Sequence, residues 1–261
     1  MNIQEIESAT RIAWPAIEEI ELEGGTLRYA SGVSRRSNAL IPKVSGRFCP
    51  QQLISETERF YSAKGQDAVI KVLITEKTNC TFGKLDMLLE EVKYQKQAPT
   101  AVLGLQLNQD PELKLSKTGF HIIESTKDDW VAAWQAVRMF NPVRYNSHRQ
   151  LLRRISGIGY CLVMHDDHLN PCATGMAVLN KKTLGIFGIA TSKKYHGQGL
   201  ASQIISELLR WGRLRGAGFA FLQVEERNLP ALALYKKFGF TQQYSYWYRV
   251  KEMAEGRVIA P

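Results

Sequence analysis

The chain has 261 residues, of which 44% are hydrophobic and 23% are charged. This balance predicts a folded protein with a sizeable core and argues against an intrinsically disordered chain. Its apolar runs are too short to cross a membrane, and its polar, acidic N-terminus differs from a secretory signal, so we expect a cytoplasmic protein with no membrane partner. The four cysteines, Cys49, Cys80, Cys161 and Cys172, form neither a CxxC pair nor a zinc spacing, which predicts reduced thiols and no metal.

Charge is distributed unevenly along the chain. The net charge is +9, with 14 Lys and Arg against 15 Asp and Glu in residues 1–116, and 20 against 10 in residues 117–261. A positive field favours an anionic partner such as a phosphorylated cofactor, an acidic substrate or nucleic acid. A basic surface without a partner explains the same excess, so charge alone leaves the choice open.

Helical and strand patterns alternate through the first half. Apolar residues recur at roughly helical spacing from Ile3 to Ile20, which predicts an opening helix. The other expected elements are a strand at 26–30, a helix at 50–63, a strand at 67–74, a helix at 84–94 and a strand at 100–107. This alternation is typical of a mixed α/β layer. The polar segment 107–118, which contains a proline, is predicted to link the two halves.

The second half shows the same alternation more fully. Asp128 is the expected N-cap of a helix that starts there. The expected elements are strands at 120–125, 184–191, 219–225 and 242–250, helices at 128–140, 200–216 and 228–239, and a pair of strands within 160–179 joined by a polar turn. Residues 84–95 and 231–242 share a helix–aromatic–strand order, which suggests an internal duplication.

Two glycines stand where a strand passes into a strongly helical run. Gly197 and Gly199 lie in the stretch KKYHGQGLAS, residues 193–202. A glycine-bearing loop between a strand and a helix is suited to phosphate, because the first N–H groups of a helix have no intrahelical partner and the helix dipole is positive there. On the glycines alone, an ordinary tight turn is the simpler interpretation.

The neighbouring motifs strengthen the phosphate interpretation. Segments 184–191, 194–201, 219–228 and 232–240 follow in an order that resembles the GNAT superfamily of acyl-CoA-dependent N-acyltransferases. The family's pattern Arg/Gln-x-x-Gly-x-Gly/Ala appears as Lys194 to Gly199, with lysine in the first position. A second element, Asn-x-x-Ala-x-x-Leu-Tyr-x-x-x-Gly-Phe, is matched by Asn228, Ala231, Leu234, Tyr235, Gly239 and Phe240.

The resemblance covers residues 117–250 and implies a mixed central sheet flanked by helices. The first half, with its stretch WPAIEE…LRYASGVSRRSNALIP, is similar to a tandem variant in which a degenerate GNAT-like half precedes a complete one. We therefore expect a degenerate N-terminal domain at 1–110 and a complete acyltransferase domain at 117–261. The first half has no Gly-x-Gly loop, which implies that it binds no CoA and instead shapes the acceptor cleft or supports the fold.

The resemblance also implies which residues bind acetyl-CoA or another acyl-CoA. The pyrophosphate is expected on the loop and helix start, namely Lys194, Tyr195, His196, Gly197, Gln198, Gly199, Leu200 and Ala201. The pantetheine arm is expected along the strand residues Ile189, Ala190 and Thr191, with a backbone N–H near Ile189 as oxyanion donor, and Asn228 belongs to the same set.

Two residues are assigned to the chemistry. Tyr235 occupies the family's general-acid position, although a packed aromatic on an amphipathic helix is the alternative. Glu225 shares a strand face with Gln223 and is the expected base; Glu226, a bound water or a merely solvated strand end are the other interpretations.

Three further features carry weaker hypotheses. The run HDDH, residues 165–168, resembles a metal cluster, but a hairpin turn is the favoured interpretation. Arg35 and Arg36 are candidates to bind an acceptor carboxylate, to pair with the acidic run 18–23, or to be surface residues. Tyrosines 244, 246 and 248 alternate and are expected to pack on one strand face.

Three functions follow from these features. The first is acetyl transfer from acetyl-CoA to a small-molecule amine. The second keeps the fold but takes the acyl group from aminoacyl-tRNA, which the basic second half would suit. The third is a non-catalytic module that binds CoA or a partner. Neither the acceptor nor the oligomeric state can be predicted.

Overall fold

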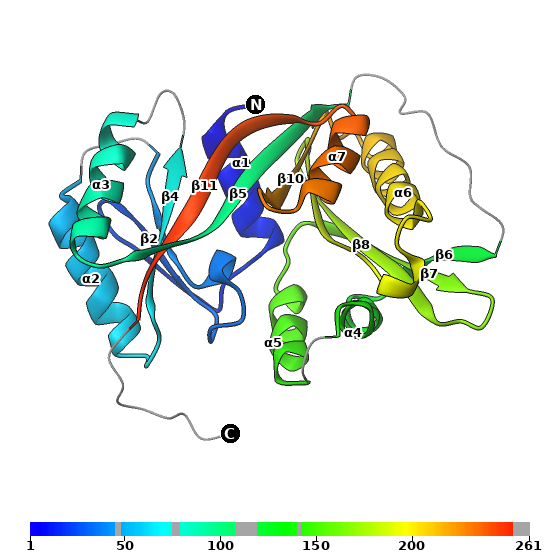
Figure 1. Cartoon of the computed structure of the whole chain (residues 1–261), viewed down its shortest axis with the longest axis horizontal. Helices are drawn as coiled ribbons and strands as arrows, with labels where there is room; N and C mark the ends of the chain where they lie inside the picture. The colour runs from blue at the N-terminus through cyan, green and yellow to red at the C-terminus, as the bar shows by residue number, and fades with distance from the viewer. Residues whose placement is uncertain (45–47, 75–78, 108–118, 140–141, 253–261) are drawn as a thin grey trace. The chain divides into compact units, whose positions relative to one another are not determined.

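The computed structural model describes residues 1–44, 48–74, 79–107, 119–139 and 142–252 (Figure 1). It shows a mixed α/β fold, as expected. The elements of the first part of the chain are α1 (Ile3–Ala13), β1 (Glu18–Glu21), β2 (Gly25–Tyr29), η1 (Arg35–Ser37), β3 (Leu40–Pro42), α2 (Pro50–Ser62), β4 (Ala68–Ile74), α3 (Asn79–Glu91) and β5 (Gln95–Gln106). The second part contains β6 (Phe120–Ser125), α4 (Lys127–Arg138), α5 (Pro142–Arg153), β7 (Ile158–Asp166), β8 (Pro171–Asn180), β9 (Thr183–Thr191), η2 (Lys193–Tyr195), α6 (Leu200–Leu214), β10 (Phe219–Glu225), α7 (Leu229–Lys237) and β11 (Thr241–Lys251).

The chain divides into two compact units that exchange segments. Unit 1 comprises Met1–Pro15, Leu103–Gln223 and Leu229–Thr241, and unit 2 comprises Ala16–Val102, Val224–Asn228 and Gln242–Pro261. Helix α1 therefore belongs with the later part of the chain, and most of β11 with the earlier part. The expected division at 1–110 and 117–261 describes consecutive halves, and the idea that one half copies the other stays a prediction. The expected linker lies outside the described residues except for Leu107.

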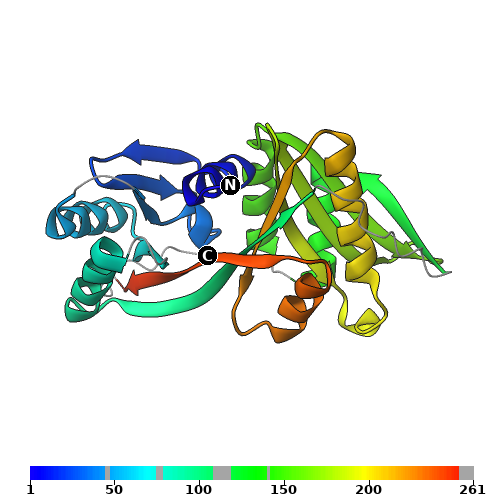
Figure 2. The same cartoon turned by 90° about the horizontal axis from the view of Figure 1, so that it is seen from above.

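In unit 1 the strands follow the order β5-β10-β9-β8-β7-β6. The pairs from β6 to β9 are antiparallel, whereas β10 runs parallel to β9. Figure 2 shows α6 on one face of this sheet and α1 and α5 on the other. The apolar stripe of α6, with Ile204, Ile205, Leu208 and Leu209 fully buried, fixes that helix on the sheet.

A tryptophan of α4 shapes the centre of this sheet. Trp130 is fully buried and donates its indole N–H to the backbone oxygen of Gly175 at 3.0 Å. A Cβ at Gly188 would lie 2.4 Å from the same ring, and Gly188 has a φ of 60°. A glycine is required there by both the close approach and the left-handed backbone.

In unit 2 the order is β1-β2-β3-β4-β11-β5. Strand β11 is antiparallel to β4, with Ser245 opposite Ile74 and Lys251 opposite Ala68. On β11 the tyrosines at 244, 246 and 248 are all buried, which confirms that they share one packed face. On its other face, Trp247 and Arg249 donate to the carboxylate of Asp86 in α3, at 2.8 Å and 2.7 Å.

This carboxylate is expected to make stability depend on pH. Burial alone would raise the pKa of Asp86, but hydrogen bonds from Arg249 and Trp247 outweigh it and hold the pKa below its ordinary value. A lowered folded-state pKa stabilises the protein above about pH 4, and this stabilisation is lost as pH falls through the lowered value. Asp86→Asn should cost about 1.5–3 kcal/mol at pH 7 and flatten the acid limb of a denaturation–pH series. An unchanged acid limb would contradict this.

Most expected elements are confirmed, and three details of the helices are wrong. The opening helix ends at Ala13, because Pro15 disfavours helical backbone in the residue before it, and Ile17 and Ile20 are exposed outside the helix. The N-cap of α4 is Thr126, whose side chain accepts from the N–H of Asp129, so Asp128 lies inside the first turn. Helix α5 was not predicted from the sequence.

Candidate functional site

The glycine loop connects β9 to α6 in unit 1. Gly197 and Gly199 have φ angles of 76° and 82°, in the left-handed region that glycine adopts without strain. A Cβ built at either position meets no atom within 4 Å. The backbone of this loop therefore borders open space, which is what a bound phosphate requires.

The start of α6 is left open in the same way. Gly199 is the N-cap residue, and it has no side chain that could bond the first turn of the helix. The first N–H group that bonds within the helix is that of Gln203, which donates to the carbonyl of Gly199 at 3.2 Å. The N–H groups before it in the first turn have no helical carbonyl to bond. Unsatisfied N–H groups and the positive end of the helix dipole together favour an anion at this position.

The side chains of Tyr195 and His196 fix the glycine loop to the neighbouring strands. Tyr195 donates its hydroxyl to Asp166 at 2.7 Å, and its ring packs edge-on against Phe120. The hydrogen bond from Tyr195 is the largest cause that lowers the pKa of Asp166, and this bond raises the pKa of Tyr195. The Nε2 of His196 lies 2.9 Å from the carbonyl of Thr191, so this nitrogen carries the proton. The loop is thus tied to the end of β7 and to the end of β9.

The pairing of strand β9 with β10 ends several residues before the glycine loop. Its pairing with β10 covers Thr183–Ile186, whereas its pairing with β8 continues to Thr191. Within this stretch the β8–β9 register shifts, so that Gly188 and Ile189 of β9 form a bulge. A bulge leaves backbone groups without ladder partners, which suits the expected contact of Ile189, whereas Ala190 lies opposite Thr174 in the β8–β9 ladder. The Thr191 carbonyl, in contrast, is engaged by His196.

Tyr235 and Asn228 come from the region of α7. Tyr235 is 7% exposed, and the centre of its ring lies 6.0 Å from that of Phe240. Asn228 is exposed, and its N–H donates to the carbonyl of Glu225 at 2.9 Å, just before α7 begins. The burial of Tyr235 suits both a packed aromatic and an acid at the base of a cleft, so its role stays a prediction.

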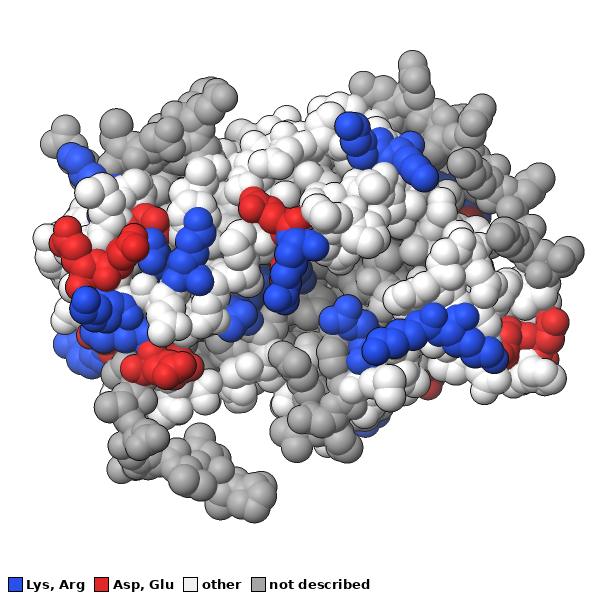
Figure 3. Space-filling view, viewed as in Figure 1, with Lys and Arg blue, Asp and Glu red and all other residues white. Residues whose placement is uncertain are grey.

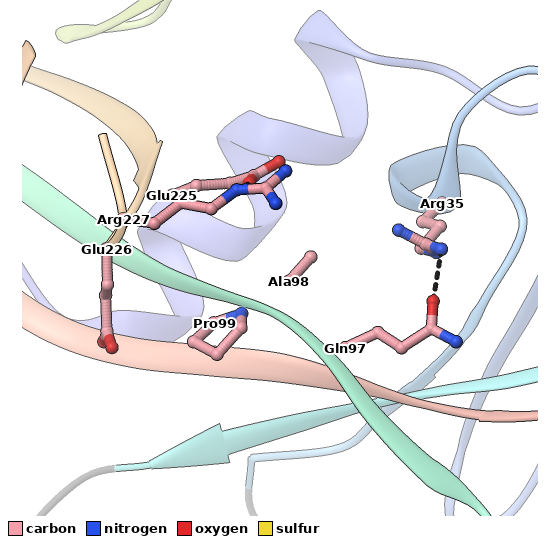
Figure 4. Close-up of a pocket in the computed structure, with 7 residues that line it drawn as sticks. All are labelled: Arg35, Gln97, Ala98, Pro99, Glu225, Glu226 and Arg227. Carbon is pink, nitrogen blue, oxygen red and sulfur yellow. Dashed lines mark hydrogen bonds and ion pairs between the residues drawn. The ribbon is translucent and has the colours of Figure 1, made fainter.

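Glu225 lines a pocket in unit 2 (Figure 4). The pocket has a volume of about 470 Å³ and is lined by Arg35, Gln97, Ala98, Pro99, Glu225, Glu226 and Arg227. The carboxylate of Glu225 accepts from the guanidinium of Arg227 at 2.6 Å. Two residues that the sequence analysis named for separate reasons, Arg35 and Glu225, therefore line the same pocket.

Comparison with known proteins shows the family to which this chain belongs. Residues 1–249 match the family model described as the C-terminal part of the probable histone acetyltransferase Rv0428c. The chain belongs to this acetyltransferase family. A curated relative, the uncharacterized N-acetyltransferase YobR of Bacillus subtilis, is 24% identical over 254 residues, which span 96% of this chain and 99% of YobR.

Solved structures share the fold of this Rv0428c-family chain. A GCN5-related N-acetyltransferase from Kribbella flavida superposes with a TM-score of 0.71 at 14% identity, over 97% of both chains. A tandem GNAT protein from the clavulanic acid biosynthesis pathway superposes with a TM-score of 0.66 at 12% identity, over 94% of this chain and 87% of that one. Together with the family match, they confirm the predicted tandem GNAT-type fold.

The structure of this family member also answers the weaker hypotheses. The run HDDH forms the end of β7 and a turn, residues 166–170, which confirms the hairpin. Within the described ranges no cluster of three or more His, Cys, Asp or Glu is arranged for a metal, and none of the helices in those ranges is long and apolar enough to span a membrane. In the acidic run, Glu18 pairs with Lys64 and Glu19 with Arg28, whereas Arg35 donates to Gln97.

Three residues that contribute to these sites were not predicted from the sequence. Asp166 anchors the loop through Tyr195, but the two lie 29 residues apart and no local pattern joins them. Gln97 and Ala98 line the pocket from β5, whose sequence resembles an ordinary strand. The available signal was Pro99, because a proline is rarely tolerated inside a strand and often marks a distortion.

Proposed function

We propose that this acetyltransferase takes the acetyl group from acetyl-CoA and transfers it to the amine of a small molecule by direct attack. The assignment of acetyl-CoA as the donor rests on the open glycine loop at the start of α6. There Gly197 and Gly199 have left-handed backbone beside empty space. This arrangement fits a pyrophosphate bound by backbone N–H groups. Lys193 and Lys194 add positive charge beside it.

In the proposed reaction the amine nitrogen forms a bond to the thioester carbon, and the carbon–sulfur bond breaks. The amine loses one proton, for which Glu225 is the proposed acceptor, and the departing thiolate gains one, for which Tyr235 is the proposed donor. The N–H groups at the β9 bulge are the proposed donors to the oxyanion, since the bulge leaves ladder positions unfilled. No covalent enzyme intermediate is needed.

The direct test has two measurements. Isothermal titration with acetyl-CoA should show one saturable site, and release of free CoA should require an added amine from a panel of small amines. Saturable binding without turnover of any amine would favour a non-catalytic module. No binding of acetyl-CoA at all would overturn the proposed donor.

Aminoacyl-tRNA is the alternative donor, and the distribution of positive charge supports it. Lys and Arg side chains form a row on the part of unit 1 seen at the lower right of Figure 3, and the second half of the chain carries the excess positive charge. Contacts to six or more phosphates would make affinity for aminoacyl-tRNA fall by roughly 10³-fold or more between about 50 and 200 mM salt. Filter binding across this salt range measures that fall. Weak binding that hardly responds to salt would exclude this donor.

Tyr195→Phe tests how the loop is held. Removing the hydroxyl breaks the bond to Asp166, so the loop loses one of its ties and should sample more conformations. We expect the Kd for acetyl-CoA to rise about tenfold, the value of one charge-assisted hydrogen bond, with kcat nearly unchanged. Asp167→Asn, which disturbs the neighbouring exposed pair with His121, is the matched control and should bind normally. If Tyr195→Phe and Asp167→Asn bind acetyl-CoA equally well, the hydrogen bond between Tyr195 and Asp166 does not contribute to binding.

A further inference from the structure

The pocket that contains Glu225 has two walls of different character. In Figure 4, Arg35 and Gln97 face it from one side, and Glu225 and Arg227 reach into it from the other, above Ala98. Glu226 turns away, and its carboxylate accepts from the hydroxyl of Ser245 at 2.9 Å. All of these residues belong to unit 2, so the pocket is formed within one compact body.

The charges in the pocket do not cancel. Arg227 pairs with Glu225, whereas Arg35 donates to the neutral side-chain amide of Gln97. Two guanidinium groups therefore accompany one inward carboxylate. A guanidinium binds a carboxylate through paired N–H donors, and Gln97 fixes the orientation of Arg35 without neutralising it.

The backbone below the pocket is held in an unusual conformation. Ala98 has a φ of 50°, in the left-handed region that a residue with a Cβ seldom adopts. The hydroxyl of Thr100 donates to the carbonyl of Ala98 at 2.8 Å, and the N–H of Glu226 donates to the carbonyl of Pro99 at 2.9 Å. Strained backbone of this kind persists where the surroundings fix it, and it is frequent at ligand sites.

We propose that this pocket binds the acceptor and that the acceptor is a free α-amino acid. The carboxylate of the amino acid binds Arg35 and Arg227, and its amine faces Glu225. The ammonium form releases one proton to solvent on binding, and Glu225 takes the second proton as the nitrogen bonds to the thioester carbon. Glu225 is suited to this role because its carboxylate lies in the same pocket as both guanidinium groups. The inference rests on the proposed acetyl transfer, and it names the acceptor class for that reaction.

The test compares amino acids with amines that lack only the carboxylate. Acetyl-CoA is supplied with each of the twenty common amino acids and, in matched pairs, with decarboxylated partners such as tyramine for tyrosine, histamine for histidine and cadaverine for lysine. CoA release gives kcat/KM for each. We expect at least one amino acid to exceed its amine by roughly tenfold or more, which is the contribution of a charge-assisted hydrogen bond.

Arg35→Gln then separates the carboxylate contact from the chemistry. For the best amino acid, KM should rise roughly ten- to hundredfold, while kcat/KM for its decarboxylated partner stays within about twofold. Arg35→Lys should restore part of the loss, because it keeps the charge without the paired donors. Arg36→Gln is the matched control: the neighbouring arginine does not line the pocket, so this variant should behave like the wild type.

Three outcomes overturn the inference and leave the proposed function standing. The first is acetylation of amines and amino acids at equal rates, and the second is an equal effect of Arg35→Gln on both members of a pair. The third is acetylation of lysine-containing peptides while all twenty free amino acids are refused. Absence of acetyl-CoA binding in the titration is a different failure, because it removes the donor and with it the reaction.

Discussion

Tyr235→Phe is expected to lower kcat for acetyl transfer by about 10²–10⁴-fold, with the Kd for acetyl-CoA within about twofold of the wild type. The substitution removes a hydroxyl and keeps the ring of Tyr235, a residue that is 7% exposed and packs near Phe240. Stability should therefore change little, while the departing thiolate loses its proton donor. Steady-state kinetics with acetyl-CoA at saturating acceptor, together with isothermal titration, measure both quantities.

The control for this variant is Tyr160→Phe. Tyr160 belongs to β7 of the same unit and stacks on Trp211 at 4.8 Å, so its ring is also packed, but it is not in the α7 motif. It should keep the wild-type kcat. If Tyr235→Phe also keeps the wild-type kcat, Tyr235 is a packing residue and the thiolate is protonated by another group or by water.

Gly199→Val should weaken acetyl-CoA binding by roughly hundredfold or more, since at least two N–H contacts to an anion are expected to be lost. The valine places a branched side chain in the space beside the loop, and φ of 82° is strained for a β-branched residue. Isothermal titration measures the affinity, and a thermal melt verifies that the variant is folded.

Gly216→Val separates the loss of space from backbone strain. Gly216 follows the other end of α6 and also has a φ of 82°, and a Cβ at this position would likewise meet no atom within 4 Å. The two substitutions therefore impose the same conformational cost at opposite ends of one helix. If both folded variants bind acetyl-CoA with equal affinity, the phosphate does not bind at the glycine loop.

Much of the fold can be predicted from periodicity, because most helices and strands here bury one regular face. Helix α6 shows this well, since its leucines and isoleucines form an unbroken stripe. Helix α5 shows the opposite case: its sequence is mostly polar, and among its residues 146–153, whose burial the structure describes, His148, Leu151 and Leu152 are buried. Such a helix is specified by its neighbours more than by its own pattern, so periodicity does not predict it.

The sites divide in the same way. The loop around Gly197 and Gly199 lies in one contiguous stretch, so its residue types and spacing carry the prediction. The pocket around Glu225 joins η1, β5 and the end of β10, which are distant in the chain. One sequence names Arg35 and Glu225 as candidates, but it contains no information on which candidates meet, because that depends on how the strands of unit 2 are ordered.

The exchange of segments between the units constrains how the protein reaches its native state. Strand β11 lies between β4 and β5 in unit 2, yet it is translated long after both of them. Residues 16–102 must therefore wait with an incomplete sheet while the intervening chain emerges, and such long-range pairing slows folding and exposes strand edges meanwhile. A gene cut between the two halves of the sequence would not yield two self-sufficient domains, since each fragment would lack a segment that completes its own core.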